Sequence, residues 1–151
     1  MLAKTHIAFG FLLALIIQNL IETGNEIIFF LLVIIGSLLP DIDSSHSKIS
    51  NRTPLIPGII SIFSKHRGIF HSLFFAFLIP GLIWYFLSPI YGAALFIGYL
   101  SHLLADAFTD SGINFLNPIT KFKIEGPITT GALAERFIFF ILIALILIEL
   151  I

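Results

Sequence analysis

The side chains most able to do chemistry in this chain are imidazoles and carboxylates that stand beside long apolar stretches. Histidine nitrogens and aspartate oxygens are common ligands of divalent metals such as zinc, manganese and iron. All five histidines and four of the nine carboxylates fall near corresponding ends of those stretches. The predicted metal ligands are His6, Asp41, Asp43, His66, His71, His102 and Asp106. Because the chain has no cysteine, a thiolate metal site and a disulfide are excluded.

Two spacings would bring pairs of these side chains towards one ion. His102 and Asp106 are four residues apart, so on a helix they share a face about 6 Å apart along the axis. Asp41 and Asp43 follow Pro40, and in extended backbone residues two apart point the same way. The alternatives are structural: a histidine–aspartate hydrogen bond that holds helices together, and a solvated or helix-capping loop. Where they do not bind metal, Asp43 and Asp106 are the candidate general bases.

The segment from His66 to Ser72 carries two of the histidines and an arginine. A spacing of five residues would turn two side chains of one helix about 140° apart. We therefore expect His66 in a loop and His71 in the first turn of a helix. Arg67 between them is a candidate catalytic residue that binds a phosphate or carboxylate group; its alternative is a basic residue at the membrane surface. His6 falls in the first turn of the first apolar stretch.

The composition indicates a protein integrated into a membrane. Of the 151 residues, 58% are hydrophobic and only 11% are charged, and the mean hydropathy is +1.06. Soluble domains are about half apolar and about a quarter charged. Five apolar stretches approach the roughly 20 residues that a helix needs to cross a bilayer: 5–21, 26–39, 69–88, 90–108 and 133–151. We predict one all-α domain over residues 1–151 with about five transmembrane helices, of which the second could instead be a buried hairpin helix.

The segments between these stretches are predicted to be polar or irregular. Residues 54–63 are apolar and flanked by prolines but too short to span, which favours an interfacial or re-entrant segment. Residues 109–132 are rich in glycine and proline, which predicts an irregular loop. We expect His46 to lie in a solvated loop, and Glu135 and Arg136 to anchor the last helix at the membrane surface.

The basic residues predict the orientation in the membrane. With five spans, all eight fall on the side that holds the N-terminus: Lys4, Lys48, Arg52, Lys65, Arg67, Lys121, Lys123 and Arg136. The positive-inside rule then places the N-terminus in the cytoplasm, in a multi-pass protein of the cell (inner or plasma) membrane. No basic patch has a nucleic-acid-binding signature, so the predicted partner is the lipid bilayer and not a nucleic acid.

The same five-helix arrangement predicts that the ligand-type side chains share one depth. At a rise of about 1.5 Å per residue, they lie about 18–24 Å from the opposite ends of their helices. This level is inside a hydrocarbon core of about 30 Å, where ionisable groups are costly and are a functional hypothesis by default. The residues at this level are His6, Asp41, His71, His102 and Asp106. We expect them to line a wet cavity that opens to the cytoplasm.

The motifs, taken in order, resemble the YdjM-like family of membrane-bound, metal-dependent hydrolases of bacteria and archaea. The matching segments are Thr5-His6-Ile7-Ala8, 36–44, 66–72, 98–106 and the Gly112 to Pro118 stretch. The resemblance covers nearly the whole chain. It implies a polytopic membrane protein and assigns metal-site roles to the seven predicted ligands, but it supplies no substrate. Phe70 stands where the family often has threonine, so that position is not expected to be chemical.

These observations together predict a cytoplasm-facing hydrolase that uses one or two divalent ions, zinc, manganese or iron, and cleaves a phosphoester of a lipid-like substrate. Two ions would use so many ligands better than one. A metal-free lipid phosphatase with a histidine nucleophile is a rival, since His102 and Asp106 resemble its last motif. A metal transporter, a sensor or a regulatory membrane scaffold is the rival from another class. The substrate and the oligomeric state are not specified by the sequence.

Overall fold

A computed structural model of the chain describes residues 1–41 and 69–151. Within these ranges it contains five α-helices and two short 3₁₀ helices, and no strand beyond two isolated β-bridges. The α-helices are α1 (Ala3–Gln18), α2 (Glu26–Leu38), α5 (Leu73–Phe86), α6 (Pro89–Ala107) and α7 (Leu133–Glu149). The 3₁₀ helices are η1 (Leu39–Asp41) and η2 (Ile69–His71). The predicted all-α class and a helix in each of the five apolar stretches are confirmed.

The lengths of these helices support the prediction of membrane spans only in part. By length and apolar composition, α6 is the one helix in the described ranges that could cross a membrane. The other four have 13 to 17 residues, against the range of about 17–25 that a span needs. The prediction of about five transmembrane helices is therefore not confirmed, and it stays a prediction.

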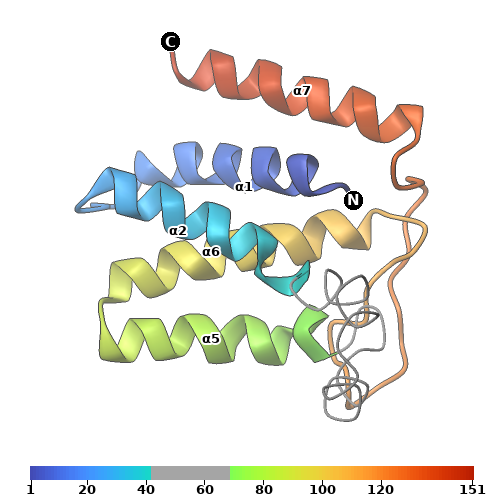
Figure 1. Ribbon diagram of the computed structural model, residues 1–151, viewed down its shortest axis with the longest axis horizontal. Helices are drawn as coiled ribbons and strands as arrows, with labels where there is room; N and C mark the ends of the chain where they lie inside the picture. The colour runs from blue at the N-terminus through green and yellow to red at the C-terminus, as the bar shows by residue number, and fades with distance from the viewer. Residues whose placement is uncertain (42–68) are drawn as a thin grey trace, which may run out of the picture.

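Helix α6 lies at the centre of the bundle. It packs against α1, α2 and α5, whereas α7 packs against α1 at the edge. Figure 1 shows the helices side by side, with the N-terminus, η1, η2 and the connection from α6 to α7 gathered at one end. This arrangement brings the start of α1, the end of α2 and the end of α6 together.

Small residues let α2 and α6 approach very closely. A Cβ built on Gly98 would lie 2.0 Å from the carbonyl oxygen of Val33, and one built on Gly36 would lie 2.3 Å from that of Leu95. Both neighbouring atoms belong to backbone, which cannot move aside without shifting a helix. Such small-residue contacts are typical of helix packing in membranes. The interface fixes the position of α2 along α6.

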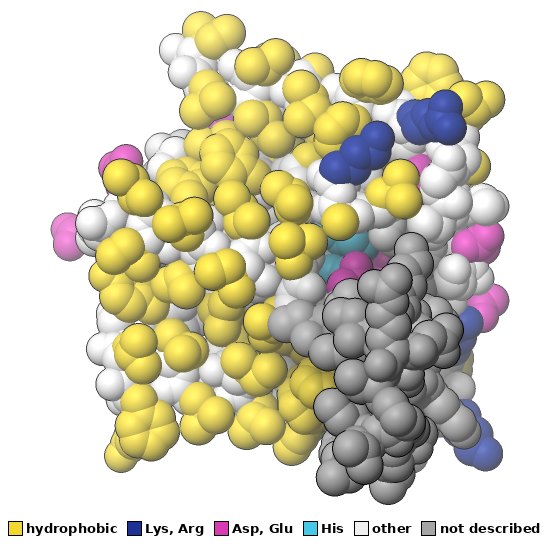
Figure 2. Space-filling view, viewed as in Figure 1, with side chains coloured by type: hydrophobic (Ala, Val, Ile, Leu, Met, Phe, Trp, Pro, Cys, Tyr) yellow, Lys and Arg dark blue, Asp and Glu magenta, His cyan; other side chains and the backbone are white. Residues whose placement is uncertain are grey.

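Large apolar side chains cover the outside of the bundle. Phe74, Phe77, Phe137 and Phe140 are each more than 60% exposed. In Figure 2, hydrophobic side chains cover most of the visible face, and the lysine and arginine side chains lie at the end that also shows histidine and acidic side chains. A soluble monomer rarely exposes so continuous an apolar surface, which suits contact with lipid.

Residues 109–132 cross the end of the bundle as an irregular connection, as predicted. Ile113 and Ile124 exchange a pair of backbone hydrogen bonds of 2.8 Å, and the amide of Leu73 donates to the carbonyl of Phe115. Gly112 has a positive φ of 56°, and a Cβ there would lie 2.4 Å from the carbonyl oxygen of Ile124. The connection is thereby held against the start of α5, beside the polar residues described next.

Candidate metal centre

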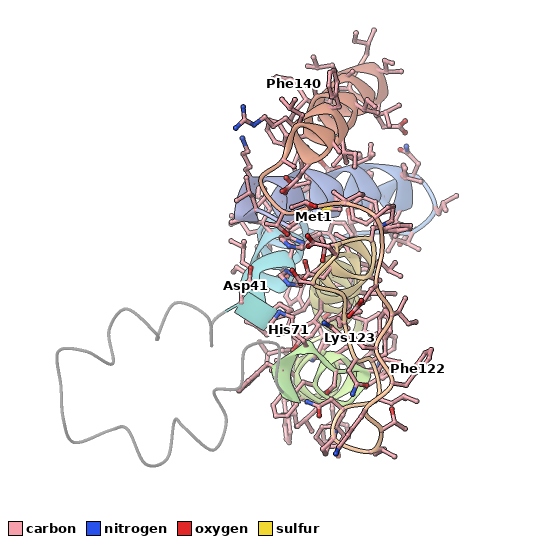
Figure 3. All side chains as sticks on the ribbon, turned by 90° about the vertical axis from the view of Figure 1, so that its right-hand side faces the viewer. Met1, Asp41, His71, Phe122, Lys123 and Phe140 are labelled. Carbon is pink, nitrogen blue, oxygen red and sulfur yellow. The ribbon has the colours of Figure 1, made fainter. Side chains whose placement is uncertain are left out.

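Five of the seven predicted ligands come together at one end of the bundle. His6 lies in the first turn of α1, Asp41 ends η1, and His71 ends η2. His102 and Asp106 lie on one face in the last turns of α6. Figure 3 looks onto this end and shows Asp41 and His71 near one another, with Met1 above them. Three separate segments and the central helix thus supply the cluster.

Distances within the cluster are those of side chains that share one small space. His102 lies in the middle: its Nε2 is 3.9 Å from Oδ1 of Asp41 and 3.8 Å from Oδ2 of Asp106. Nε2 of His6 is 3.3 Å from Oδ1 of Asp106, and Nε2 of His71 is 3.6 Å from Oδ1 of Asp41. The rings of His6 and His102 are stacked, with centroids 3.8 Å apart.

The cluster is buried, and most of its imidazole nitrogens form no hydrogen bond with the described residues. His6, His71, His102 and Asp106 are at most 2% exposed, while the side chain of Asp41 is 34% exposed. Within the described part of the chain, five of the six ring nitrogens of the three histidines have no hydrogen-bond partner. Buried polar atoms are almost always satisfied, so a group of orphaned imidazole nitrogens beside two carboxylates calls for a further binding partner. A divalent cation fits this donor set.

Two overlapping groups of ligand atoms could hold such a cation. One is His6, Asp41 and His102, the other is His71, His102 and Asp106, and in each the ligand atoms lie within 4.8 Å of one another. His102 belongs to both groups. The mixture of nitrogen and oxygen donors suits zinc, manganese or iron.

The backbone of α2 fixes which nitrogen of His102 is available to a cation. Nδ1 of His102 lies 2.8 Å from the carbonyl oxygen of Ser37. Because a carbonyl only accepts hydrogen bonds, Nδ1 carries the proton and donates it. Nε2 is left with its lone pair directed towards the carboxylates. A backbone carbonyl in this position is a usual support of metal-binding histidines.

Glu135 and the chain start support the same end of α1. Glu135 is 1% exposed and accepts hydrogen bonds from the amides of Leu2 and Gly131 and from the hydroxyl of Thr5. Its carboxylate joins the starts of α7 and α1, where three donors compensate its burial. The expected position of Glu135 at the membrane surface stays a prediction. The amino group of Met1 pairs with Oδ1 of Asp106.

The structure does not describe most of the remaining predicted site residues. Asp43, His46, His66 and Arg67, with the apolar piece 54–63, lie outside the described residues. Asp110, four residues after Asp106 and beyond the end of α6, is exposed and belongs to neither group. Sequence reasoning missed the Ser37 carbonyl and the hydroxyl of Tyr99, which donates to the carbonyl of Phe70 beside His71. No sequence spacing signals either contact.

Comparisons with known proteins place the chain in a family. The family model described as YdjM inner membrane protein matches residues 1–150. The chain is 34% identical over 111 residues to YvsG of Bacillus subtilis strain 168, which covers 69% of the chain and 66% of YvsG. It is 33% identical over 114 residues to the inner membrane protein YdjM of Escherichia coli K12, which covers 70% of the chain and 58% of YdjM.

The matches thus span less than two thirds of the length of these relatives. No solved structure matches the chain. The relatives named as inner membrane proteins agree with the apolar surface and support a membrane location. Because the family model covers all but the last residue, the chain belongs to the YdjM family of inner membrane proteins.

Proposed function

We propose that this chain is a membrane-embedded, metal-dependent hydrolase that cleaves a phosphoester of a lipid-like substrate. The described ligands are His6, Asp41, His71, His102 and Asp106, and they hold one or two ions of zinc, manganese or iron. His66 and Asp43 complete the proposed ligand set. Residues 1–151 act as one domain in this proposal.

One observation carries the proposal: three buried histidines with orphaned ring nitrogens converge with two carboxylates. A set of purely structural histidines would be expected to satisfy its nitrogens with protein groups, as Nδ1 of His102 does. A divalent cation supplies Lewis acidity, which activates water and stabilises negative charge on a phosphoryl oxygen.

The chain's own residues have separate roles in this proposal. Ser37 holds His102 in the tautomer that offers Nε2. Asp106 or Asp43 accepts a proton from water where it is not occupied as a ligand. Arg67 is assigned to the phosphoryl group, since a guanidinium donates two parallel hydrogen bonds to such oxygens.

The proposed topology extends what the helices support. We infer a multi-pass arrangement with five helices in the membrane and the N-terminus in the cytoplasm. The apolar exterior of α5 and α7 supports it, and so does the placement of all eight basic residues on one predicted side. The metal centre would then open towards the cytoplasm.

Removal of the metal is expected to abolish hydrolysis reversibly. The protein purified in detergent would be assayed with phospholipid and lysophospholipid phosphoesters, before and after exhaustive chelation. We expect phosphate release to fall at least roughly 100-fold, because metal-activated water is the nucleophile, and to return when zinc, manganese or iron is added. A sample treated with the same chelator, saturated beforehand with the metal that restores activity, should stay active; loss of activity there would reveal damage by the reagent itself.

Two outcomes would replace this proposal. Hydrolysis that survives chelation would support the metal-free mechanism with a histidine nucleophile. Metal-dependent ion flux in proteoliposomes, with no hydrolysis of any phosphoester, would support a transporter instead.

A further inference from the structure

A cleft with both polar and apolar lining residues opens beside Met1 and the connection between α6 and α7. Its volume is about 670 Å³, within the range of about 300–1,000 Å³ that is usual for small-molecule sites. Its polar lining includes the side chains of Ser111, Asn114, Lys121, Lys123 and Thr130. Among the residues that the structure describes, no acidic side chain lines the cleft, although Lys123 also reaches Glu125 with an Nζ to Oε1 distance of 3.0 Å at the exposed rim. The cleft is therefore suited to an anion.

A second, apolar pocket also borders Met1. It has a volume of about 240 Å³ between α1, α6 and α7, and its wall includes Phe9, Ala105, Phe108, Ile138 and Leu142. Its lining is almost entirely hydrocarbon, so it is suited to an alkyl chain and not to a charged group. The exposed phenylalanines of α7 place it beside the apolar exterior of the bundle.

The two cavities share one lining residue, Met1, next to the metal centre. Met1 lines both of them, and its amino group contacts Asp106. Ala105 in the wall of the apolar pocket directly precedes Asp106, and Thr5 in the same wall directly precedes His6. Figure 3 shows Lys123 and Met1 at the same end of the bundle as Asp41 and His71. A molecule in both cavities would pass Met1, which contacts Asp106 of the proposed centre.

We propose that the two cavities bind different parts of one amphiphilic substrate, a single-chain lipid with an anionic phosphate headgroup. Lys121 and Lys123 bind the headgroup, and the pocket between α1, α6 and α7 takes the first part of the hydrocarbon chain. This assignment rests on the proposed hydrolase function, because the bond to be cleaved must lie between the two cavities. It adds residues that determine specificity and are separate from the metal ligands.

The test measures binding in metal-free protein, so that it does not depend on hydrolysis. The probes are lysophosphatidate, a monoacylglycerol of the same chain length, and inorganic phosphate, each titrated into protein in nonionic detergent micelles. We expect lysophosphatidate to bind more tightly than either partial probe, because it alone fills both cavities. Equal affinity for inorganic phosphate and lysophosphatidate would overturn the proposal, and so would absence of lysophosphatidate binding.

Paired variants separate the cavities. Lys121→Gln with Lys123→Gln should weaken lysophosphatidate binding on the order of tenfold or more by loss of charge-assisted contacts, and leave monoacylglycerol binding unchanged. Its control, Lys4→Gln with Arg136→Gln, removes the same charge outside the cleft. Ile138→Trp should weaken binding of both lipids by filling the pocket, whereas Ile141→Trp, on the exposed side of α7, should not.

The results distinguish this inference from the proposed function. In one outcome, both cavity variants weaken lipid binding but the protein shows no metal-dependent phosphate release. That outcome would support the two binding sites and refute the hydrolase. In the opposite outcome, the protein releases phosphate in a metal-dependent way but both cavity variants bind lipid with wild-type affinity. That outcome would support the hydrolase and refute the two binding sites. Control variants that lose as much affinity as the cavity variants would also refute them.

Discussion

His102→Ala is expected to lower the affinity for a divalent metal by at least roughly 100-fold, and hydrolysis with it. Loss of a group that merely supports a metal ligand costs about 10- to 100-fold in affinity, and His102 is itself shared by both groups of ligand atoms. Its Nε2 faces Asp41 and Asp106 at almost equal distances, so its loss removes one donor from each group. Competition titration against a metal-binding dye would measure the change.

The matched control for this variant is Leu104→Ala. Leu104 lies two residues further along α6, is 39% exposed and belongs to neither ligand group. The Leu104→Ala protein should bind metal with the affinity of the unmodified protein. Unchanged metal affinity in a folded His102→Ala protein would show that the imidazole shared by the two groups is not a ligand. That result would refute the proposed centre.

Gly98→Ala is expected to destabilise the protein by about 1–3 kcal/mol and to weaken metal binding as well. The added methyl group would meet the carbonyl oxygen of Val33 at 2.0 Å and the amide nitrogen of Ser37 at 2.8 Å. Overpacking of this kind forces backbone to shift, and here α2 must move away from α6. The Ser37 carbonyl, which orients His102, moves with it. Thermal unfolding in detergent and metal titration would measure the two effects.

Gly81→Ala gives the opposite expectation and serves as the control. Gly81 lies inside α5, where a Cβ would meet nothing within 4 Å. Alanine favours a helix over glycine by roughly 0.5–1 kcal/mol, so this variant should be as stable as the unmodified protein or more so. If both glycine variants unfolded at the same temperature, the close approach of α2 and α6 would be wrong.

The sequence was sufficient to predict where the helices lie. Each apolar stretch contains a helix whose ends fall within a few residues of the prediction, because long apolar runs bounded by polar residues are strong signals. It was not sufficient to predict how many helices span. Helix α2 has 13 residues and α7 carries charged side chains near both ends, so length alone does not decide between a span and a buried helix.

The candidate site was predicted from residue type and depth, and the structure brings five predicted ligands together. The i,i+4 relation of His102 and Asp106 survives because α6 is a regular helix to Ala107. The hydrogen bonds of Glu135 could not be predicted, because its donors belong to Leu2, Thr5 and Gly131, which are remote in sequence or belong to a loop. The backbone contact of His102 could not be predicted, since any residue at position 37 would supply a carbonyl.

Elemental analysis of the detergent-purified protein tests the central claim most directly. The unmodified chain, Asp41→Asn and His102→Ala would be purified without added metal, and zinc, manganese and iron would be counted per folded chain. We expect about one or two equivalents in the unmodified protein, and clear losses in both variants, because orphaned imidazole nitrogens and carboxylates supply the ligands. A folded unmodified protein without metal, or full metal content in both variants, would contradict this account.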